Sequence, residues 1–267
     1  MDQGLIRLLV FASVLVIMAS AEAIWPRKER VMKRSMRWFN NLSLSVLNSV
    51  VIKVLGPITA IAVATYALNN GYGLLGLIPW ALPLWLEIII GVAILDFLIY
   101  VQHVLSHRVP VLWRFHKVHH ADRDVDVTTG IRFHPVEALF SMLYKCVFIL
   151  LLGPLPVAVF LFEVLLNGSA MFNHANVKLP SWLDKTLRLV IVTPDSHRVH
   201  HSTIPSETDS NYGFFLSIWD RIFKTYTPQP KLGHDGMVIG LNQYQTEAPA
   251  SILWSLKTPF NKKRAAK

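Results

Sequence analysis

Histidine is the residue type that dominates the chemistry of this sequence. Ten of its 11 histidines fall between residues 103 and 201, most of them three or four residues apart in the boxes HVLSH, HKVHH and HRVHH. Residues i, i+3 and i+4 lie on one face of a helix, so each box is expected to present two or three imidazoles to one point. Imidazole binds zinc, copper, nickel and iron. Three such boxes predict a site for more than one metal ion.

The predicted ligands are almost all imidazoles. Glutamate and the motif Glu-x-x-His supply most ligands in helical-bundle di-iron proteins, yet no Glu-x-x-His and no zinc-protease motif His-Glu-x-x-His occurs here. One tetrahedral zinc takes at most four ligands, whereas these histidines suffice for two metals, and two oxygen-activating irons suit such a site. The predicted ligands are His103, His107, His116, His119, His120, His134, His174, His197, His200 and His201.

Two carboxylates are candidates for orienting these ligands. Asp195 stands two residues before His197, and Asp96 lies in an apolar run on the same helical face as His103. Metal-bound histidines usually donate their second N–H to a carboxylate or carbonyl, and a charge at membrane depth is costly unless it is paired or functional. We predict catalytic supporting roles for both, with an ordinary buried hydrogen bond as the alternative for Asp96. His234 stands apart and is predicted to be a non-ligand.

Apolar runs must position the boxes. A mean hydropathy of +0.40, with 52% apolar and 16% charged residues, is typical of a membrane protein. Three runs are long enough to cross the roughly 30 Å hydrocarbon layer: residues 5–25, 42–68 and 74–102. A fourth run, 136–172, is interrupted by Gly153-Pro154 and predicts a hairpin of two short helices or a re-entrant one. The predicted fold is an all-α integral membrane bundle, with about four transmembrane helices plus this hairpin.

The orientation of the bundle follows from basic residues. The first run has a rival interpretation as a cleaved secretory signal, because Arg7 and the alanines near its end fit such a pattern. Residues 27–37, however, carry six basic side chains and one acid, and a short basic loop stays on the cytoplasmic side. We therefore predict a retained transmembrane helix and histidines that face the cytoplasm. The net charge of +9 comes without a nucleic-acid motif, so anionic lipid headgroups, and not nucleic acid, are the predicted partner.

Other cofactor motifs are missing from the sequence. Cys146 is the only cysteine, which excludes disulfides, thiolate zinc sites and iron–sulfur clusters. Gly71, Gly73 and Gly76 spell G-x-G-x-x-G, but they follow an apolar helix instead of a strand, so we predict no dinucleotide site. Electrons are therefore expected from a separate donor protein or a small reductant. No linker divides the chain, which is predicted to form a single membrane-embedded domain, 1–267.

The text around the boxes resembles the membrane-bound fatty acid hydroxylase and sterol desaturase superfamily, in particular its bacterial members. The resemblance covers residues 80–227, the predicted catalytic region, and includes SHRVPVLWRFHKVHH, TTGIRFHPVEALFSMLYK, FNHANV, TPDSHRVHHS and ETDSNYGFFLSIWDRIFKTY. It implies four or more membrane helices under a cytoplasmic cap with a histidine-ligated di-iron centre that includes His134 and His174. Some hydroxylases of the superfamily carry a second histidine four residues after the position of His174, where this chain has Lys178.

The function that this resemblance implies is oxygen-dependent oxidation of an unactivated C–H bond in a lipid that enters from the bilayer. The substrate is a sterol, a fatty acyl chain or an ether lipid, and the outcome is hydroxylation or desaturation. Two iron ions and O2 supply the chemistry, while the protein holds the substrate and excludes water. A histidine-rich membrane metal transporter and a membrane zinc hydrolase are the alternatives, which metal identity and count discriminate. A bacterial inner membrane is favoured over the endoplasmic reticulum.

Overall fold

The computed structural model describes residues 3–55, 59–77 and 82–261. These residues form helices and no strands, with three isolated β-bridges. The predicted all-α fold is confirmed. The bundle is built from α1 (Gln3–Ile24), α2 (Arg34–Leu55), α3 (Ala60–Asn69), α4 (Leu84–Arg108), α6 (Pro135–Leu152) and α7 (Pro156–Asn173).

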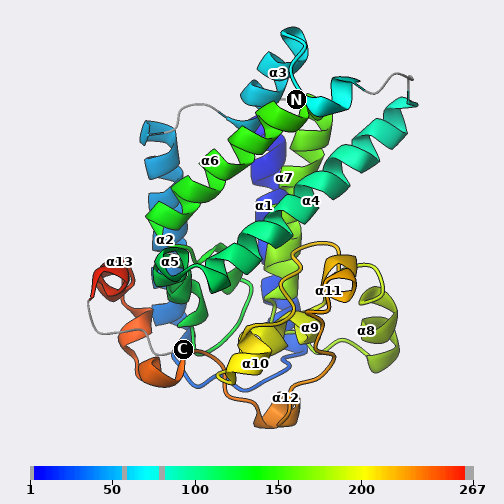
Figure 1. Cartoon of the computed structure of the whole chain (residues 1–267). Helices are drawn as coiled ribbons and strands as arrows, with labels where there is room; N and C mark the ends of the chain where they lie inside the picture. Colours follow the sequence, from blue (N-terminus) through cyan, green and yellow to red (C-terminus); the bar gives the residue numbers. More distant parts are fainter. Residues whose placement is uncertain (1–2, 56–58, 78–81, 262–267) are drawn as a thin grey trace.

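Shorter helices form the cap. Figure 1 shows them gathered at one end of the bundle, opposite α3. They are α5 (Pro110–His120), α8 (Ser181–Leu187), α9 (Pro194–His200), α10 (Pro205–Thr208), α11 (Ile218–Ile222), α12 (Gly233–Gly236) and α13 (Ile252–Lys257). Single 3-10 turns complete the described chain: η1 (Leu74–Leu77), η2 (Thr129–Ile131), η3 (Asn242–Tyr244), η4 (Ala248–Ala250) and η5 (Thr258–Phe260).

The bundle has the dimensions and surface of a membrane domain. Five segments are long and apolar enough to cross a bilayer: Gln3–Ile24, Arg34–Leu77, Leu84–Arg108, Pro135–Leu152 and Pro156–Asn173. Large apolar side chains on the outside of these helices are exposed, among them Leu8, Ile17, Val54 and Leu151. In water such a surface would be a liability, whereas in a bilayer it contacts lipid. The chain is therefore a multi-pass integral membrane protein.

The predicted runs and the observed helices differ in two places. Run 42–68 corresponds to two helices, α2 and α3, and α3 begins after Thr59, whose side chain accepts a hydrogen bond from the Ala62 amide. Run 74–102 corresponds to η1 and then α4. Residues 56–58 and 78–81, which these runs include, lie outside the described residues.

The predicted hairpin is confirmed as two helices of 18 residues each, α6 and α7. Gly153 ends α6 in the left-handed conformation, with φ +68°. Gly73, in the loop after α3, lies against it so closely that a Cβ on Gly73 would be 2.3 Å from the Gly153 Cα. Glycine is required at this crossing of two backbones. The G-x-G-x-x-G pattern therefore belongs to a loop that packs on the hairpin turn.

Helix α7 is the centre of the bundle and packs against α1, α3 and α4. The buried core is formed by residues of α3, α4, α6 and α7, namely Ala60, Ala64, Leu95, Ile99, Ile149, Val159 and Phe162. The last turns of α4 and the end of α7 extend from this core into the cap. Pro110 has no amide hydrogen to continue α4, and it begins α5 instead. The chain thus turns directly from a membrane helix carrying the first histidine box into a cap helix carrying the second.

Candidate metal centre

Nine buried histidines form two groups at the junction of bundle and cap. Five of them, His103, His107, His116, His120 and His200, make up the first group, and four, His119, His174, His197 and His201, make up the second. Within each group the potential ligand atoms lie within 4.8 Å of one another. Buried clusters of neutral imidazoles suit transition metals such as zinc, copper and iron. The arrangement can hold two metal ions.

Each histidine-rich element contributes to this centre. Helix α4 carries the first box, α5 the second, and α9 with its C-cap residue the third, while His174 caps the C-terminus of α7. As expected, two imidazoles of each box enter one group, but the third histidine of the second and third boxes enters the other group. Neighbouring residues on a helix are rotated by about 100°, so His119 and His120 enter different groups, and so do His200 and His201. A pair of adjacent histidines thus serves both groups.

Six of the nine rings are oriented by a hydrogen bond from Nδ1. Four Nδ1 atoms pair with backbone carbonyls, and two pair with carboxylates. The pairs are His103 with Tyr212 O (2.7 Å), His107 with Asp209 Oδ1 (3.3 Å), His116 with Glu137 Oε1 (2.6 Å), His119 with Arg132 O (3.2 Å), His174 with Ala170 O (2.6 Å) and His200 with Ser210 O (2.6 Å). Such bonds fix the tautomer and the orientation of the ring, so that Nε2 is the nitrogen that a metal would bind.

The Nε2 atoms have the spacing of metal ligands. The Nε2 atoms of His107 and His120 are 3.1 Å apart, and His174 Nε2 is 3.1 Å from the Nε2 atoms of His119 and His197. Two nitrogens about 2.1 Å from one metal and at right angles would be about 3 Å apart. Other buried ring nitrogens have no hydrogen-bond partner among the described residues: His103 Nε2, His116 Nε2, His200 Nε2 and both nitrogens of His201. Buried polar atoms are normally paired, so these atoms fit a metal.

The electrostatics of the site favour neutral imidazoles. Burial, followed by the neighbouring imidazoles, lowers the pKa values of His119, His120 and His201 well below the usual 6.5. Burial also lowers the pKa of His174 to about 4 and that of His200 to about 3. Only a neutral imidazole has a lone pair for a metal. These rings are therefore in the ligand form at neutral pH.

His134 is placed outside both groups, in contrast to the sequence prediction. It is the N-cap of α6: its Nδ1 accepts from the Val136 amide, and its Nε2 lies 3.3 Å from the carbonyl oxygen of Leu256. With both nitrogens engaged and the ring packed on Phe115 and Phe260, it has no nitrogen to offer a metal. We leave it out of the ligand set. His234 is also in neither group of the described residues.

The two predicted carboxylates contact other partners. Asp96 accepts hydrogen bonds from the Phe215 and Leu216 amides and from Trp219 Nε1. Asp195 pairs with Arg198 and Arg27. Within the described chain, neither forms a hydrogen bond with a grouped histidine. Asp96 is a buried hydrogen-bond acceptor, which was the alternative prediction for it. It holds the segment whose Tyr212 carbonyl orients His103, so it acts on that histidine only indirectly.

Glu137 is a supporting residue that the sequence analysis missed. Its carboxylate bonds His116 and is almost fully buried in the first turn of α6. The signal was present, because Glu137 is one of only two acids in the apolar run 136–172.

Replacing Glu137 by glutamine is expected to weaken metal binding roughly 10- to 100-fold, because His116 would lose its charged partner. Competition with a graded series of chelators measures this loss. The matched control is Glu87→Gln. Glu87 lies on α4, about 24 Å along the helix from His103, so this substitution should leave the metal affinity unchanged. Equal affinities for Glu137→Gln and the unsubstituted protein would mean that His116 is oriented by other contacts.

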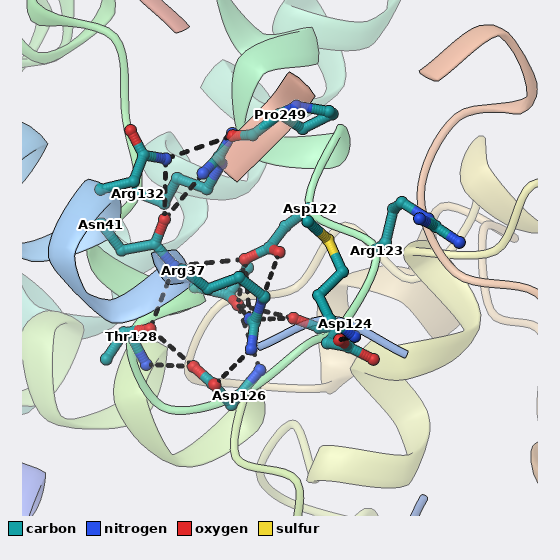
Figure 2. A network of polar contacts seen from close by, with 12 residues as sticks. Arg37, Asn41, Asp122, Arg123, Asp124, Asp126, Thr128, Arg132 and Pro249 are labelled. Carbon is teal, nitrogen blue, oxygen red and sulfur yellow. Dashed lines mark hydrogen bonds and ion pairs between the residues drawn. The ribbon is translucent and has the colours of Figure 1, made fainter. Parts of the chain in front are cut away.

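A second missed feature is a buried ion network next to the second box. Arg37 of α2 is fully buried and pairs with Asp122 (2.7 Å) and Asp126 (2.6 Å), as Figure 2 shows. Burial alone would raise the pKa of Asp122, but Arg37 outweighs it, and the pKa is lowered to about 2. Arg132 donates to the Val118 carbonyl, and its own carbonyl orients His119. The network therefore fastens the chain after the second box to α2.

A cavity of about 190 Å³ opens beside the first group. His103, His116 and Glu137 are among its lining residues, and the other lining side chains, most of which come from α4, α6 and α7, are mostly apolar. Ligand sites typically combine an apolar lining with a few polar groups. The cavity therefore offers space for an apolar molecule next to the candidate metal site.

Comparisons with known proteins agree with this geometry. The sequence model of the fatty acid hydroxylase family matches residues 88–225. Ornithine lipid hydroxylase OlsE of Rhizobium tropici is 30% identical over 226 residues, 83% of this chain and 67% of that protein. Alkylglycerol monooxygenase of Xenopus tropicalis is 32% identical over 69% of this chain and 40% of its own length. Human cholesterol 25-hydroxylase is 30% identical over 55% and 53% of the two chains. No solved structure matches the chain.

The matched region and the grouped histidines coincide. Residues 88–225 contain all nine histidines of the two groups, together with the hairpin α6–α7 and the segment that orients His103. The match covers more than half of the chain, and the relatives are lipid hydroxylases and monooxygenases. The chain belongs to the fatty acid hydroxylase family of oxidoreductases.

Proposed function

We propose that this protein is a membrane-bound lipid oxidase in which the two histidine groups bind two iron ions and use O2 to oxidise a C–H bond. The observation that carries the proposal is the pair of buried all-imidazole groups beside an apolar cavity. The relatives that act on lipids, by name an ornithine lipid hydroxylase, an alkylglycerol monooxygenase and a cholesterol hydroxylase, support it. The substrate is accordingly a lipid with an unactivated alkyl group, and 80–227 is the catalytic region.

The proposed irons supply oxygen activation and the oxidation of the C–H bond. The protein's own residues hold the ions and control the surroundings. Nδ1 partners such as Glu137 and the Tyr212 carbonyl keep the imidazoles aimed at the ions. All nine rings are buried, so bulk water is kept from the site. Apolar side chains from α4, α6 and α7 hold the alkyl group next to His103 and His116.

The proposed orientation places the histidine groups on the cytoplasmic side, because the basic segment 27–37 joins the cap end of α1 to α2. The electrons for O2 reduction come from a separate donor protein or a small reductant on that side. A bacterial inner membrane fits this arrangement.

The proposal is tested by purifying the protein in detergent, without oxygen, after expression with iron. About two irons per chain, and O2-dependent oxidation of lipid extracts with incorporation of labelled oxygen, are the expected results. A single zinc that supports lipid hydrolysis would replace the proposal by a hydrolase. Metal movement across vesicles without lipid oxidation would replace it by a transporter. Nine grouped histidines exceed the four ligands that one tetrahedral zinc needs, which favours the oxidase.

A further inference from the structure

An ion cluster lies inside the bundle, away from the histidines. Glu163 of α7 pairs with Lys145 of α6, with 3.4 Å between Oε1 and Nζ, and also with Arg7 of α1. Two cations thus share one carboxylate. Among the residues that the structure describes, no other ion pair reaches Arg7 or Lys145. Charged side chains within membrane helices are costly unless paired, and they mark functional sites. The two cations carry one positive charge more than the single carboxylate neutralises, so the cluster can bind one further anionic group.

Lys145 lines the same cavity as His103 and His116. Glu137, Ser141 and Lys145 all line this cavity, and their spacing of four residues places them on one face of α6. Glu137 is the partner of His116, so it marks the metal end. Eight residues of helix separate it from Lys145, a rise of about 12 Å. Apolar side chains, including Met142 and Leu166, lie among the other lining residues.

We propose that Lys145 binds an acidic end group of the lipid substrate and thereby sets which carbon is oxidised. The carboxylate of a fatty acid or of a similar acidic lipid would occupy the place next to Lys145. The alkyl chain would then run along α6 and present a carbon about 12 Å away to the first histidine group. The binding step stands on the cavity and the ion cluster alone, while the choice of carbon rests on the proposed function.

Replacing Lys145 tests its proposed role in binding the acidic group without leaving a buried charge unpaired. Glu163 keeps its pair with Arg7 when Lys145 is replaced. Lys145→Met therefore does not leave the Glu163 carboxylate unpaired, and the expected loss is confined to the cavity. Lys145→Arg keeps the charge. Lys53→Met, the same substitution at an exposed lysine of α2 outside the cavity, is the matched control.

The first experiment measures binding to metal-free protein in detergent, with dodecanoate and methyl dodecanoate as probes. The unsubstituted protein is expected to bind the acid roughly 10- to 100-fold more tightly than the ester, as a charge-assisted hydrogen bond would provide. Lys145→Met should abolish this preference, whereas Lys145→Arg and Lys53→Met should keep it. Equal binding of acid and ester, or a preference that survives in Lys145→Met, would overturn the proposal.

The second experiment locates the product in iron-loaded protein given acids of several chain lengths. The oxidised carbon is expected at a constant distance from the carboxylate in the unsubstituted protein and at scattered positions in Lys145→Met. An oxidised position that follows the methyl end of the chain instead would contradict the proposed anchor. Acid-selective binding without oxidation by any variant would count against the proposed function alone, because the binding experiment does not depend on iron.

Discussion

Replacing either His200 or His201 by alanine is expected to remove about one of the two proposed irons, and a different one in each variant. The two residues are adjacent, but His200 lies in the first group and His201 in the second. Each group would lose one imidazole while the other stays complete. Both variants should lose essentially all lipid oxidation, because the proposed chemistry needs both ions. The double variant should retain neither ion.

Iron per chain, measured by elemental analysis of protein purified without oxygen, decides this prediction. The matched control is His134→Ala, which removes a buried imidazole of the same region that neither group contains. It should keep both irons and lose only the stability of a helix cap, about 1 kcal/mol. Loss of iron in this control would restore His134 to the ligand set. Loss of both irons in each single variant would indicate one shared site instead of two groups.

Arg37→Met is expected to lower the free energy of unfolding by about 3–5 kcal/mol, because it leaves buried carboxylates without their cation. Asp122 and Asp126 would then lie close together in a region that excludes water, with side-chain exposures of 2% and 1%. For a chain of this size such a loss corresponds to a fall of roughly 10 °C in the thermal midpoint. The same variant should also bind less iron, because the loop behind His119 would loosen.

Thermal unfolding in detergent and iron content together test this expectation. Arg34→Met, one turn earlier on α2, is the matched control: its side chain is 36% exposed, and a partly exposed ion pair contributes at most about 1 kcal/mol. A fall of the thermal midpoint in Arg37→Met no larger than in the control would mean that Asp122 and Asp126 take up protons or find other partners. An intact iron content with a lowered thermal midpoint in Arg37→Met would mean that the network stabilises the fold but does not affect metal binding.

The histidine centre was largely predictable from local sequence. Box spacing of three and four residues is a property of the helix itself, so the ligand boxes of α4, α5 and α9 could be identified without knowledge of their surroundings. The long apolar runs likewise follow from composition, and the glycine-proline interruption predicted the hairpin of α6 and α7. His134 could not be assigned from local sequence, because a histidine before a proline fits both a ligand and a helix cap, and its packing on Phe115 and Phe260 favours the cap.

The sequence by itself determined the helical membrane fold, the family resemblance and nine of the proposed ligands, because periodicity and hydropathy are local properties that each segment carries alone. The tertiary structure alone decided the division of the histidines into two groups. It also revealed Glu137 behind His116, Arg37 among its aspartates, and the cation of Lys145 in the cavity. These are contacts between residues up to 89 positions apart, and which distant side chains meet depends on how the helices pack.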